Sequence, residues 1–339
     1  MAISPAYVQV HPSYTEPGML LQYNQASDAF DQLADGQPLM RLQEGDLLVY
    51  IKRLEIRTEL AAGQSAANQL PGVAIASSMI STPSYLQRVR SIWDHHDVAA
   101  AGRWGYSLPE AFRLGMRQSH FQFLRTALLY GYQPANGEGI LNTNGATSVS
   151  LPADTFGDTT ILTYDPGQLA LFILLQIGAL KTRTNQLGIP RRFSLLMPQR
   201  VGAQMEWGDV VQLTSYQRVG AGTQTTAGMI GEIAAANGDR ITWGYDDTLI
   251  GKGAGGSDAF LITMPEVENP QRPGINTNEF ARLTPSISAN SLQYVDMAAP
   301  REIPTPLPAG ATDYVAELRT TSGWVVRPEA TTIISMVYQ

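Results

Sequence analysis

The sequence predicts an α+β protein, because it combines a long β-hairpin, one long amphipathic helix and a separate region in which helices and strands alternate. The hairpin comes first, over about residues 45–92, and the helix follows over about 108–130. The alternating region spans about 161–304, and strand-like runs close the chain. We therefore expect one lobe built from both ends of the chain, with a layered α/β lobe inserted into it.

The N-terminal segment, residues 1–44, has no sustained helical or strand period and is rich in Pro, Gln, Asp and Tyr. A segment without a periodic apolar face has little to pack with by itself and would fray in isolation. We expect it to form an arm that lies on another surface, and a neighbouring copy of the chain could hold it.

The hairpin prediction begins at GDLLVYIKRLEIRTE, whose period of two places charges of alternating sign on one strand face. Small residues and a Pro-Gly turn follow, and VAIASSMIST at 73–82 is predicted to be the returning strand. A hairpin of this length has little core, so it rests either on its own domain or on a partner. The candidate intersubunit contacts are the charged residues of the first strand: Lys52, Arg53, Glu55, Arg57 and Glu59.

The long helix is the strongest helical signal in the chain. SLPEAFRLGMRQSHFQFLRTALLYG places Ser107 and Glu110 at the spacing of a capping box and has Gly131 at its end. Apolar residues recur at three- and four-residue steps and define one buried stripe, so Arg113, Arg117 and Arg125 are expected to project elsewhere. At about 1.5 Å per residue the helix is a spine of roughly 35 Å.

The alternating region begins with a second helix, predicted from the N-cap Asp165 and the proline after it toward Gln186. FSLLMP and ITWGYDD are predicted strands, and VGAQMEW and TTAGMIGEIAAANG are predicted helices. A proline-rich stretch follows, and the chain ends in DYVAELRT and GWVVRPEATTIISMVY, which have the composition of strands.

Three short motifs accompany this order of parts: GEGILN at 137–142 after the long helix, GAGGSDAF before a strand, and the late GWVVRPEATTIISM strand. Together with the order of parts, they resemble the Hong Kong 97-type major capsid proteins of tailed bacteriophages. The resemblance covers nearly the whole chain after residue 40. It implies four parts: an N-arm at 1–44, an extended loop at 45–92, a peripheral domain at 93–160 with 305–339, and an axial domain at 161–304.

This resemblance implies a structural subunit, not an enzyme, that self-assembles into the pentamers and hexamers of an icosahedral head enclosing double-stranded DNA. It also implies assembly in the bacterial cytoplasm, a final place in the virion, and portal and decoration proteins as partners. Only some 44 residues precede the hairpin, which favours a separate scaffold protein over a cleaved segment. Lys52 is the only lysine of the hairpin, and no covalent cross-link is expected.

Composition excludes several other classes. The chain has 23 basic and 30 acidic side chains and a net charge of -7, so it lacks the basic footprint of a nucleic-acid-binding protein. It has no cysteine, which removes disulfides and thiolate zinc sites. Its longest apolar run, LALFILLQIGAL, is shorter than the roughly 20 residues that span a membrane, and no membrane is expected as a partner.

Several motifs contain the residue types of an active site without the geometry that its chemistry requires. The glycines from Gly251 to Gly256 match a dinucleotide fingerprint, but SDAFLITM after them is predicted to be a strand, so a turn is favoured. Asp94-His95-His96-Asp97 is interpreted as a polar turn, and Ser119 and His120 diverge on a helix.

We expect no catalytic residue, metal or cofactor. The alternatives are a cytosolic nucleotide-binding α/β enzyme using the loop 251–256, or another virion subunit of a tail or decoration. Acids without a predicted common site are Glu206, Asp209, Asp246, Asp247 and Asp258.

Overall fold

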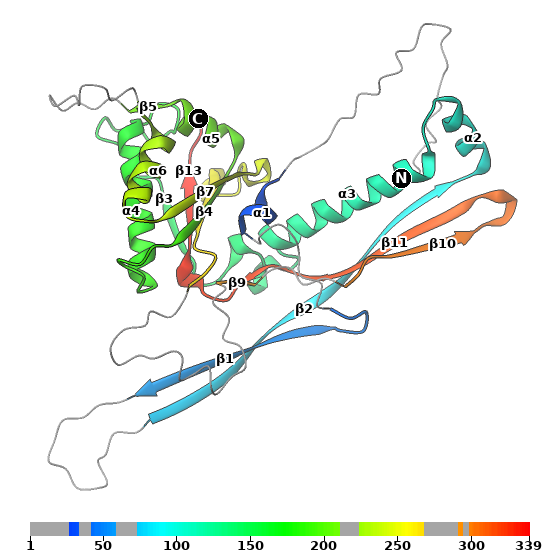
Figure 1. The fold of residues 1–339 in the computed structure, drawn as a ribbon, viewed down its shortest axis with the longest axis horizontal. Helices are drawn as coiled ribbons and strands as arrows, with labels where there is room; N and C mark the ends of the chain where they lie inside the picture. The colour runs from blue at the N-terminus through cyan, green and yellow to red at the C-terminus, as the bar shows by residue number, and fades with distance from the viewer. Residues whose placement is uncertain (1–26, 34–41, 59–72, 211–223, 268–290, 294–297) are drawn as a thin grey trace, which may run out of the picture.

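The computed structural model describes residues 27–33, 42–58, 73–210, 224–267, 291–293 and 298–339. Within these ranges the side chains of 51–58, 73–74, 80, 209–210, 292–293 and 309 are not described. Figure 1 shows an elongated molecule with a long hairpin that projects from it. The helices are α1 (Ala29–Leu33), α2 (His95–Arg103), α3 (Leu108–Leu129), α4 (Pro166–Arg183), α5 (Gln199–Trp207) and α6 (Thr226–Ala236).

Two main sheets organise the strands. The first has the order β1 (Leu48–Thr58), β2 (Val73–Trp93), β11 (Thr312–Thr321), β10 (Arg301–Pro306). The second has the order β3 (Thr147–Ser150), β13 (Thr331–Met336), β8 (Asp258–Thr263), β4 (Arg192–Met197), β7 (Arg240–Tyr245). Two short pairs complete the described strands: β12 (Trp324–Val325) with β9 (Leu292–Gln293), and β5 (Asp209–Val210) with β6 (Gln224–Thr225).

The hairpin is confirmed, but its second strand is much longer than predicted. β2 continues past residue 82 to Trp93, because its second half pairs antiparallel with β11, a strand more than 200 residues away in the chain. Pro83 forms the last pair with β1, and the pairing with β11 begins at Ser84. Proline cannot donate a ladder hydrogen bond, so this exchange of partners is a place where a strand tolerates it.

The spine helix is confirmed as α3, and it begins where predicted, with Ser107 as its N-cap residue, but the predicted capping box does not form. The side chain of Ser107 caps no backbone N–H, and Glu110 instead forms an ion pair with Arg113 at 2.8 Å. The capping-box interpretation is therefore wrong. The predicted end is correct: Gly131 has φ +69° and donates its N–H to the carbonyl oxygen of Thr126, which closes the helix.

One face of α3 contacts both lobes. Its N-terminal half places Met116 in a cluster with Trp93 and Tyr314 of the first sheet. Its C-terminal half contributes Leu128 to the core beneath the second sheet. Arg125, expected to project away from this stripe, is only 3% exposed, so that expectation is wrong. Its position between Leu124 and Leu128 puts it at the edge of the buried stripe, where tertiary contacts cover it.

The inner strands β4 and β8 of the five-stranded sheet are buried on both faces. On β4, Phe193 and Leu195 face the cluster formed with α4, α5 and α6, whereas Leu196 faces α1 and the end of α3. β8 alternates in the same way, with Phe260 on one side and Leu261 on the other. This alternation explains the nearly continuous apolar runs of these two strands, which lie between helices on both sides (Figure 1).

Part of the predicted N-terminal arm is described, and its own chain holds it. Asp28 exchanges two hydrogen bonds with the backbone of Tyr245 in β7, at 3.1 and 3.0 Å. Ala29, Phe30 and Leu33 are buried against β4 and β7. A neighbouring copy is therefore not needed to hold residues 27–33, contrary to what the sequence alone suggested. The remainder of the arm, at 1–26 and 34–41, lies outside the described residues.

The C-terminal strands divide between the two sheets. β10 and β11 join the hairpin strand β2, as expected for a lobe built from both ends of the chain. β13 instead pairs antiparallel with β8 and parallel with β3 in the α/β sheet. This position differs from the expected assignment of 305–339 to a single peripheral domain. A 3-10 turn at Pro328–Ala330 separates β12 from β13 and lets the chain cross to the other sheet.

Candidate functional site

The hairpin of β1 and β2 leaves the body of the molecule (Figure 1), and large apolar side chains are exposed on it. Tyr50, Ile75 and Met79 are 58%, 67% and 66% exposed. Tyr50 pairs directly with Ser81, and alternate residues of a strand share a face, so these three side chains belong to one face of the hairpin. We call this set the apolar hairpin face. A two-stranded ribbon with such a face is marginal by itself, and contact with another surface would stabilise it.

The predicted charged contacts lie on the same hairpin. Four of the five are on β1, and the fifth, Glu59, lies outside the described residues. The side chains of these four are also outside the described set, so their contacts stay a prediction. The backbone register pairs Lys52 with Met79, Arg53 with Ser78, Glu55 with Ala76, and Arg57 with Ala74.

A polar junction holds the base of the hairpin. The hydroxyl of Ser84 in β2 donates to the carbonyl oxygen of Asp46, just before β1, at 2.5 Å. Arg319 of β11 donates to the same carbonyl oxygen at 3.2 Å and to the Ser84 hydroxyl oxygen at 3.0 Å. The hairpin is therefore fixed to the body at the point where the pairing partner of β2 changes from β1 to β11.

A buried carboxylate ties β2 to the end of the spine helix. Glu138 is 6% exposed and accepts a hydrogen bond from the Tyr85 hydroxyl at 2.7 Å. Its other oxygen accepts from the Ser322 hydroxyl at 2.6 Å and from the backbone N–H groups of Tyr132 and Gln133 at 3.2 and 3.0 Å. Four donors on one carboxylate compensate for its burial. We call Tyr85, Glu138 and Ser322, with these two N–H groups, the hairpin anchor.

The anchor also changes the acidity of two tyrosines. Burial raises the pKa of Tyr85, and the hydrogen bond to Glu138 and its negative charge raise it further. Burial, followed by the charge of Glu138, raises the pKa of Tyr132. The Tyr85 phenol therefore stays protonated and acts as a donor. The rings of Tyr85 and Tyr132 meet edge to face, with centroids 4.5 Å apart, and Tyr132 stacks on Phe123 of the spine helix.

Steric constraints explain why glycine stands in the GEGILN motif and at the end of the spine helix. Gly139 has φ +82°, and a Cβ added there would lie 2.3 Å from the carbonyl carbon of Tyr130. A Cβ on Gly131 would lie 2.5 Å from Glu138. Two backbone segments cross here, and only glycine lets them approach so closely. Asn142 secures the crossing by donating from Nδ2 to the carbonyl oxygen of Tyr130 at 2.7 Å.

Sequence reasoning identified this motif but missed Tyr85 and Ser322. No local signal could have found them, because they lie 53 and 184 residues from Glu138 in the chain. They meet only because β2 and the turn after β11 converge on the end of α3.

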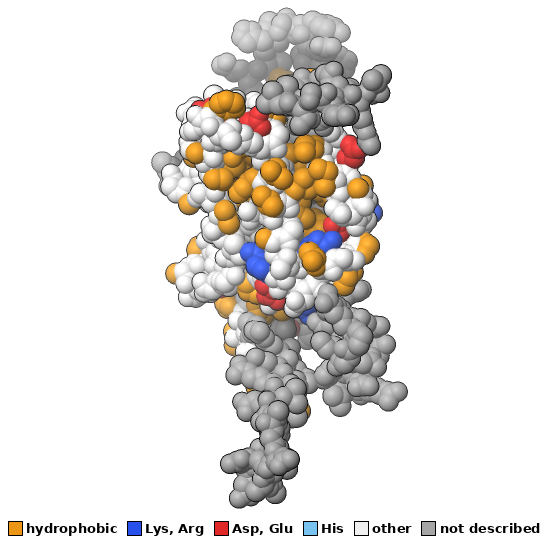
Figure 2. Space-filling view, turned by 90° about the vertical axis from the view of Figure 1, so that its left-hand side faces the viewer, with side chains coloured by type: hydrophobic (Ala, Val, Ile, Leu, Met, Phe, Trp, Pro, Cys, Tyr) orange, Lys and Arg blue, Asp and Glu red, His pale blue; other side chains and the backbone are white. Residues whose placement is uncertain are grey.

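A second uncovered apolar surface lies on the α/β lobe. Figure 2 shows hydrophobic side chains gathered on the face formed by α4 and α6. Leu171 and Leu175, one helical turn apart on α4, are 55% and 60% exposed, and Ile233 of α6 is 37% exposed. α4 has no charged side chain before Lys181, so its outer side is as apolar as its inner side. A helix that is apolar all round is typically buried, whereas the outer side of α4 is exposed in this structure.

The histidine pair at 95–96 begins a helix and does not form a turn. Asp94 is the N-cap of α2 and accepts the N–H of Asp97 at 2.8 Å, while the Asp97 carboxylate accepts the N–H of Asp94 at 3.3 Å. The polar-turn interpretation is therefore wrong: the two aspartates form a capping box. Among the residues that the structure describes, no group of three or more potential metal ligands comes together.

The other motifs that resemble active sites are explained by local structure. Ser119 donates to the carbonyl oxygen of Gly115 at 3.0 Å, and His120 is buried, with its pKa lowered by that burial. The glycine loop forms a 3-10 turn at Ala254–Gly256 and leads into β8, as predicted, so no helix N-terminus faces the position of a pyrophosphate. No described helix is both long enough and apolar enough to cross a membrane.

Four of the five scattered acids have separate structural partners. Asp258 forms a bidentate ion pair with Arg200, and Asp247 accepts the backbone N–H of Gln199 at 2.9 Å. Asp246 binds Ser27 and Thr248, and Glu206 accepts from the hydroxyl of Tyr245. The side chain of Asp209 is not described.

Comparison with known proteins gives a uniform result. No protein-family model and no curated protein matches the sequence. Solved structures match the fold: the capsid of Myoviridae Phage XM1 has a TM-score of 0.66 and 12% identity, covering 96% of this chain and 97% of that one. The capsid of the Cyanophage P-SCSP1u has a TM-score of 0.54 and 12% identity, with 96% and 93% covered. A capsid chain of the empty GTA particle has a TM-score of 0.53 and 11% identity, with 97% and 95% covered. The mixed helix and strand fold of this chain is, over nearly its whole length, that of phage capsid proteins.

Proposed function

We propose that this chain is the major capsid protein of a tailed bacteriophage, with the Hong Kong 97-type fold, and that its role is structural and not enzymatic. The observation that carries the proposal is the likeness in fold to capsid chains over 96% of this chain and 97% of the matched one. Because both chains are covered almost completely, the likeness is to a whole subunit and not to a shared module.

Two uncovered surfaces support the proposal physically. The apolar hairpin face and the outer side of α4 expose large hydrophobic side chains, up to 67% exposed on the hairpin. Exposed apolar patches of this kind indicate contact with another protein. In a shell, each of these surfaces would be covered by a neighbouring copy, and the charged residues Lys52, Arg53, Glu55, Arg57 and Glu59 would contribute polar contacts at the hairpin.

The proposed assembly follows from the symmetry of shells. Head-to-tail contacts between different surfaces of identical subunits close into rings, and we propose pentamers and hexamers that tile an icosahedral head around double-stranded DNA. Separate scaffold and portal proteins, and a decoration protein, are the proposed partners. Assembly would take place in the bacterial cytoplasm and the product would reside in the virion. The proposed parts are the N-arm at 1–44, the extended loop at 45–92, the peripheral domain and the axial domain.

The test is expression of the full chain, alone and together with its scaffold protein, followed by light scattering and negative-stain electron microscopy. Shells, rings or other large regular oligomers are expected. A stable monomer under both conditions that binds a nucleotide would contradict the proposal and favour an α/β enzyme. No described residue favours that alternative, since the loop at 251–256 leads into a strand.

A further inference from the structure

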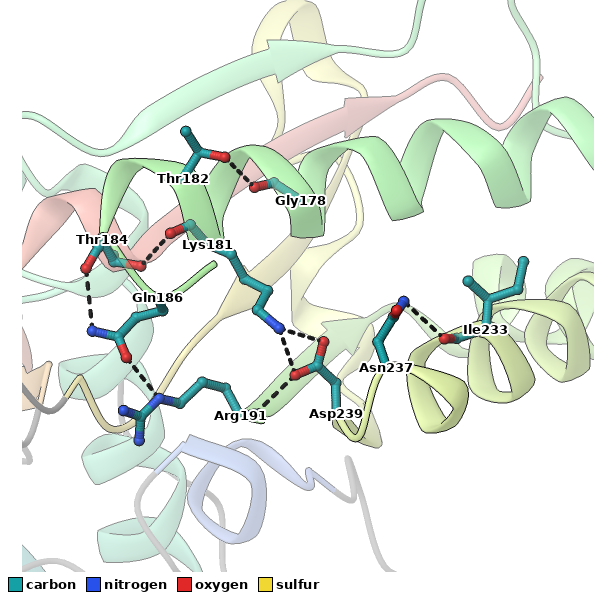
Figure 3. A network of polar contacts seen from close by, with 9 residues as sticks. All are labelled: Gly178, Lys181, Thr182, Thr184, Gln186, Arg191, Ile233, Asn237 and Asp239. Carbon is teal, nitrogen blue, oxygen red and sulfur yellow. Dashed lines mark hydrogen bonds and ion pairs between the residues drawn. The ribbon is translucent and has the colours of Figure 1, made fainter. Parts of the chain in front are cut away.

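The edges of the two main sheets are not equally open to a further strand. An edge strand exposes unpaired N–H and C=O groups, and proteins usually shorten, cover or block it. In the five-stranded sheet, β3 has only four residues. β7 is held at both ends by its own chain. Tyr245 hydrogen-bonds to Asp28, and Asp239, just before β7, pairs with Lys181 at 2.8 Å and accepts the N–H of Arg191 at 2.8 Å (Figure 3).

In the four-stranded sheet, prolines block the edge formed by β10. The N–H of Leu307 donates to the carbonyl oxygen of Ala311 at 2.8 Å, a pair that continues the register of β10 with β11. Backbone groups alternate in direction along a strand, so those of residues 302, 304 and 306 point away from β11. Pro304 and Pro306 have no N–H, so this edge offers few donors to a further strand.

The opposite edge, formed by β1, carries no such block. The N–H of Ser84 donates to the carbonyl oxygen of Leu47 at 2.9 Å, in the same register that pairs β1 with β2. The odd-numbered residues of β1 therefore direct their backbone groups toward β2, and the even-numbered residues from 48 to 58 direct theirs outward. β1 contains no proline, and no other described strand pairs with its outer side. This edge can accept a strand.

The charges of β1 fit an antiparallel copy of the same strand. Arg53, Glu55 and Arg57 are alternate residues of β1, and their register partners on β2 are serine and alanine, which carry no charge. Edge charges of one sign would repel a second copy of the strand. Charges of alternating sign do not, because in every second register an antiparallel copy sets opposite signs against each other.

We infer that β1 pairs antiparallel with β1 of a second copy across a twofold axis at Leu54. The inference rests on the proposed function, which supplies the second copy, since an icosahedral shell has twofold axes where identical surfaces meet. Leu54 then opposes Leu54 of the second copy, and residues 50–58 of both strands overlap. The outward backbone groups of the even-numbered residues form the ladder, and a marginal two-stranded ribbon becomes part of a wider sheet.

The charges select this register. With the axis at Leu54, Arg53 of each copy opposes Glu55 of the other, at positions where opposed Cα atoms are only about 4.5 Å apart. An axis at Glu55 would set that glutamate against itself and Arg53 against Arg57. An axis at Ile56 would again oppose unlike charges, Glu55 and Arg57, but within β1 only residues 54–58 would overlap. The axis at Leu54 therefore combines opposite charges with the longer ladder.

Charge reversals in the full chain test this register. Arg53→Glu and Glu55→Arg each oppose like charges, and each is expected to raise the protein concentration needed for assembly by about tenfold or more. The swapped variant Arg53→Glu/Glu55→Arg restores opposite charges and is expected to stay within about threefold of the wild type. Glu55→Arg/Arg57→Glu is the matched control. It has the same composition as the swapped variant but sets Arg53 opposite an arginine, so it should assemble as poorly as the single variants.

Engineered cysteines test the pairing directly, because the chain has none of its own. Leu54→Cys places two thiols on opposed residues whose Cα atoms are about 5.5 Å apart, so oxidised shells should contain disulfide-linked dimers. Ile56→Cys is the matched control. With the axis at Leu54, position 56 opposes position 52, so the two introduced thiols lie about 13 Å apart along the strands and should not be linked.

The outcomes separate the inference from the proposed function. If the wild type forms no assembly, the proposed function fails. If shells form but Leu54→Cys yields no linked dimers, the inference fails and the proposed function stands. Dimers from Ile56→Cys alone, or rescue by Glu55→Arg/Arg57→Glu in place of the swapped variant, overturn the inferred register. Circular dichroism establishes that the unassembled single variants are folded, so their loss of assembly and its recovery in the swapped variant support the inference.

Discussion

At the scale of single residues, the burial of the Glu138 carboxylate requires a physical explanation. It is a charged group in a buried position, and such groups are tolerated only when hydrogen bonds replace the lost water. The hairpin anchor supplies four donors from three segments of the chain. Removing the charge would leave those donors with weaker acceptors, so the cost should exceed that of losing a single neutral hydrogen bond.

We predict that Glu138→Gln lowers the free energy of unfolding by about 2–4 kcal/mol, because an amide offers one acceptor oxygen to four donors. Tyr85→Phe, which removes only one donor, should cost about 1–2 kcal/mol. Denaturant unfolding of the unassembled protein measures both. The matched control is Glu110→Gln, in the surface ion pair with Arg113, which should change stability by less than about 0.5 kcal/mol. An equal effect at positions 138 and 110 would show that the anchor contributes nothing.

A second prediction separates backbone strain from steric overlap at glycine. Gly139 and Gly157 have similar φ angles, +82° and +92°, but an added Cβ meets Tyr130 at 2.3 Å in the first case and nothing within 4 Å in the second. Gly157→Ala should cost about 1 kcal/mol from strain alone, and Gly139→Ala at least about 3 kcal/mol. Thermal unfolding of both variants measures the difference. Equal costs would mean that the crossing at Gly139 can relax.

At the scale of elements, β2 belongs to two structures at once. Its first half is a strand of the projecting hairpin, and its second half is a central strand of the body sheet, covered by the spine helix. The hairpin is therefore a continuation of a core strand and not a loop tied on at its ends. The junction at Ser84 and the hairpin anchor at Tyr85 fix the point where one role gives way to the other.

The charged face of the hairpin gives a prediction at this scale. The double variant Arg53→Glu/Arg57→Glu should block assembly and leave the unassembled subunit folded, because strand pairing uses the backbone and the register partners are small residues. Arg53→Lys/Arg57→Lys retains the charge and should assemble. Electron microscopy of the assembly reactions and circular dichroism of the subunits provide the two measurements. Normal shells from the double Glu variant would show that these arginines take no part in the contact between subunits.

At the scale of the whole molecule, net charge governs what the protein attracts. The chain has a net charge of -7, and two arginines of the body sheet are paired with acids: Arg88 with Glu317 and Arg90 with Asp313, both at 2.7 Å. These two arginines therefore already have acidic partners and contribute little to neutralising phosphates. Under the proposed function, this net charge would let a shell of such subunits enclose DNA without holding it tightly.

We predict that the purified protein at about 0.15 M salt does not shift duplex DNA in an electrophoretic assay at about 10 μM subunit, because few counterions would be released. Lowering the salt should produce weak binding at most. A complex that persists at high salt would contradict this expectation and would indicate a basic surface that net charge does not reveal.

The sequence by itself determined most of the elements. Capping, periodicity and turn residues act locally, so the long helix, the hairpin, α4 with its Asp165 cap and the strands of the α/β lobe could all be predicted. The order of these elements was enough to predict the capsid fold that the structural comparisons support. Local geometry also correctly favoured a turn at 251–256.

Tertiary structure decided what depends on contacts between distant residues. It lengthened β2 through pairing with β11, placed β13 in the α/β sheet and covered Arg125. It also assembled the hairpin anchor around Glu138 and set Arg192 beside Arg240 at the start of β4 and β7. No short window of sequence contains these partners. Register and chain crossing bring them together, and the free energy of burial and hydrogen bonding favours the contacts only once the whole fold has formed.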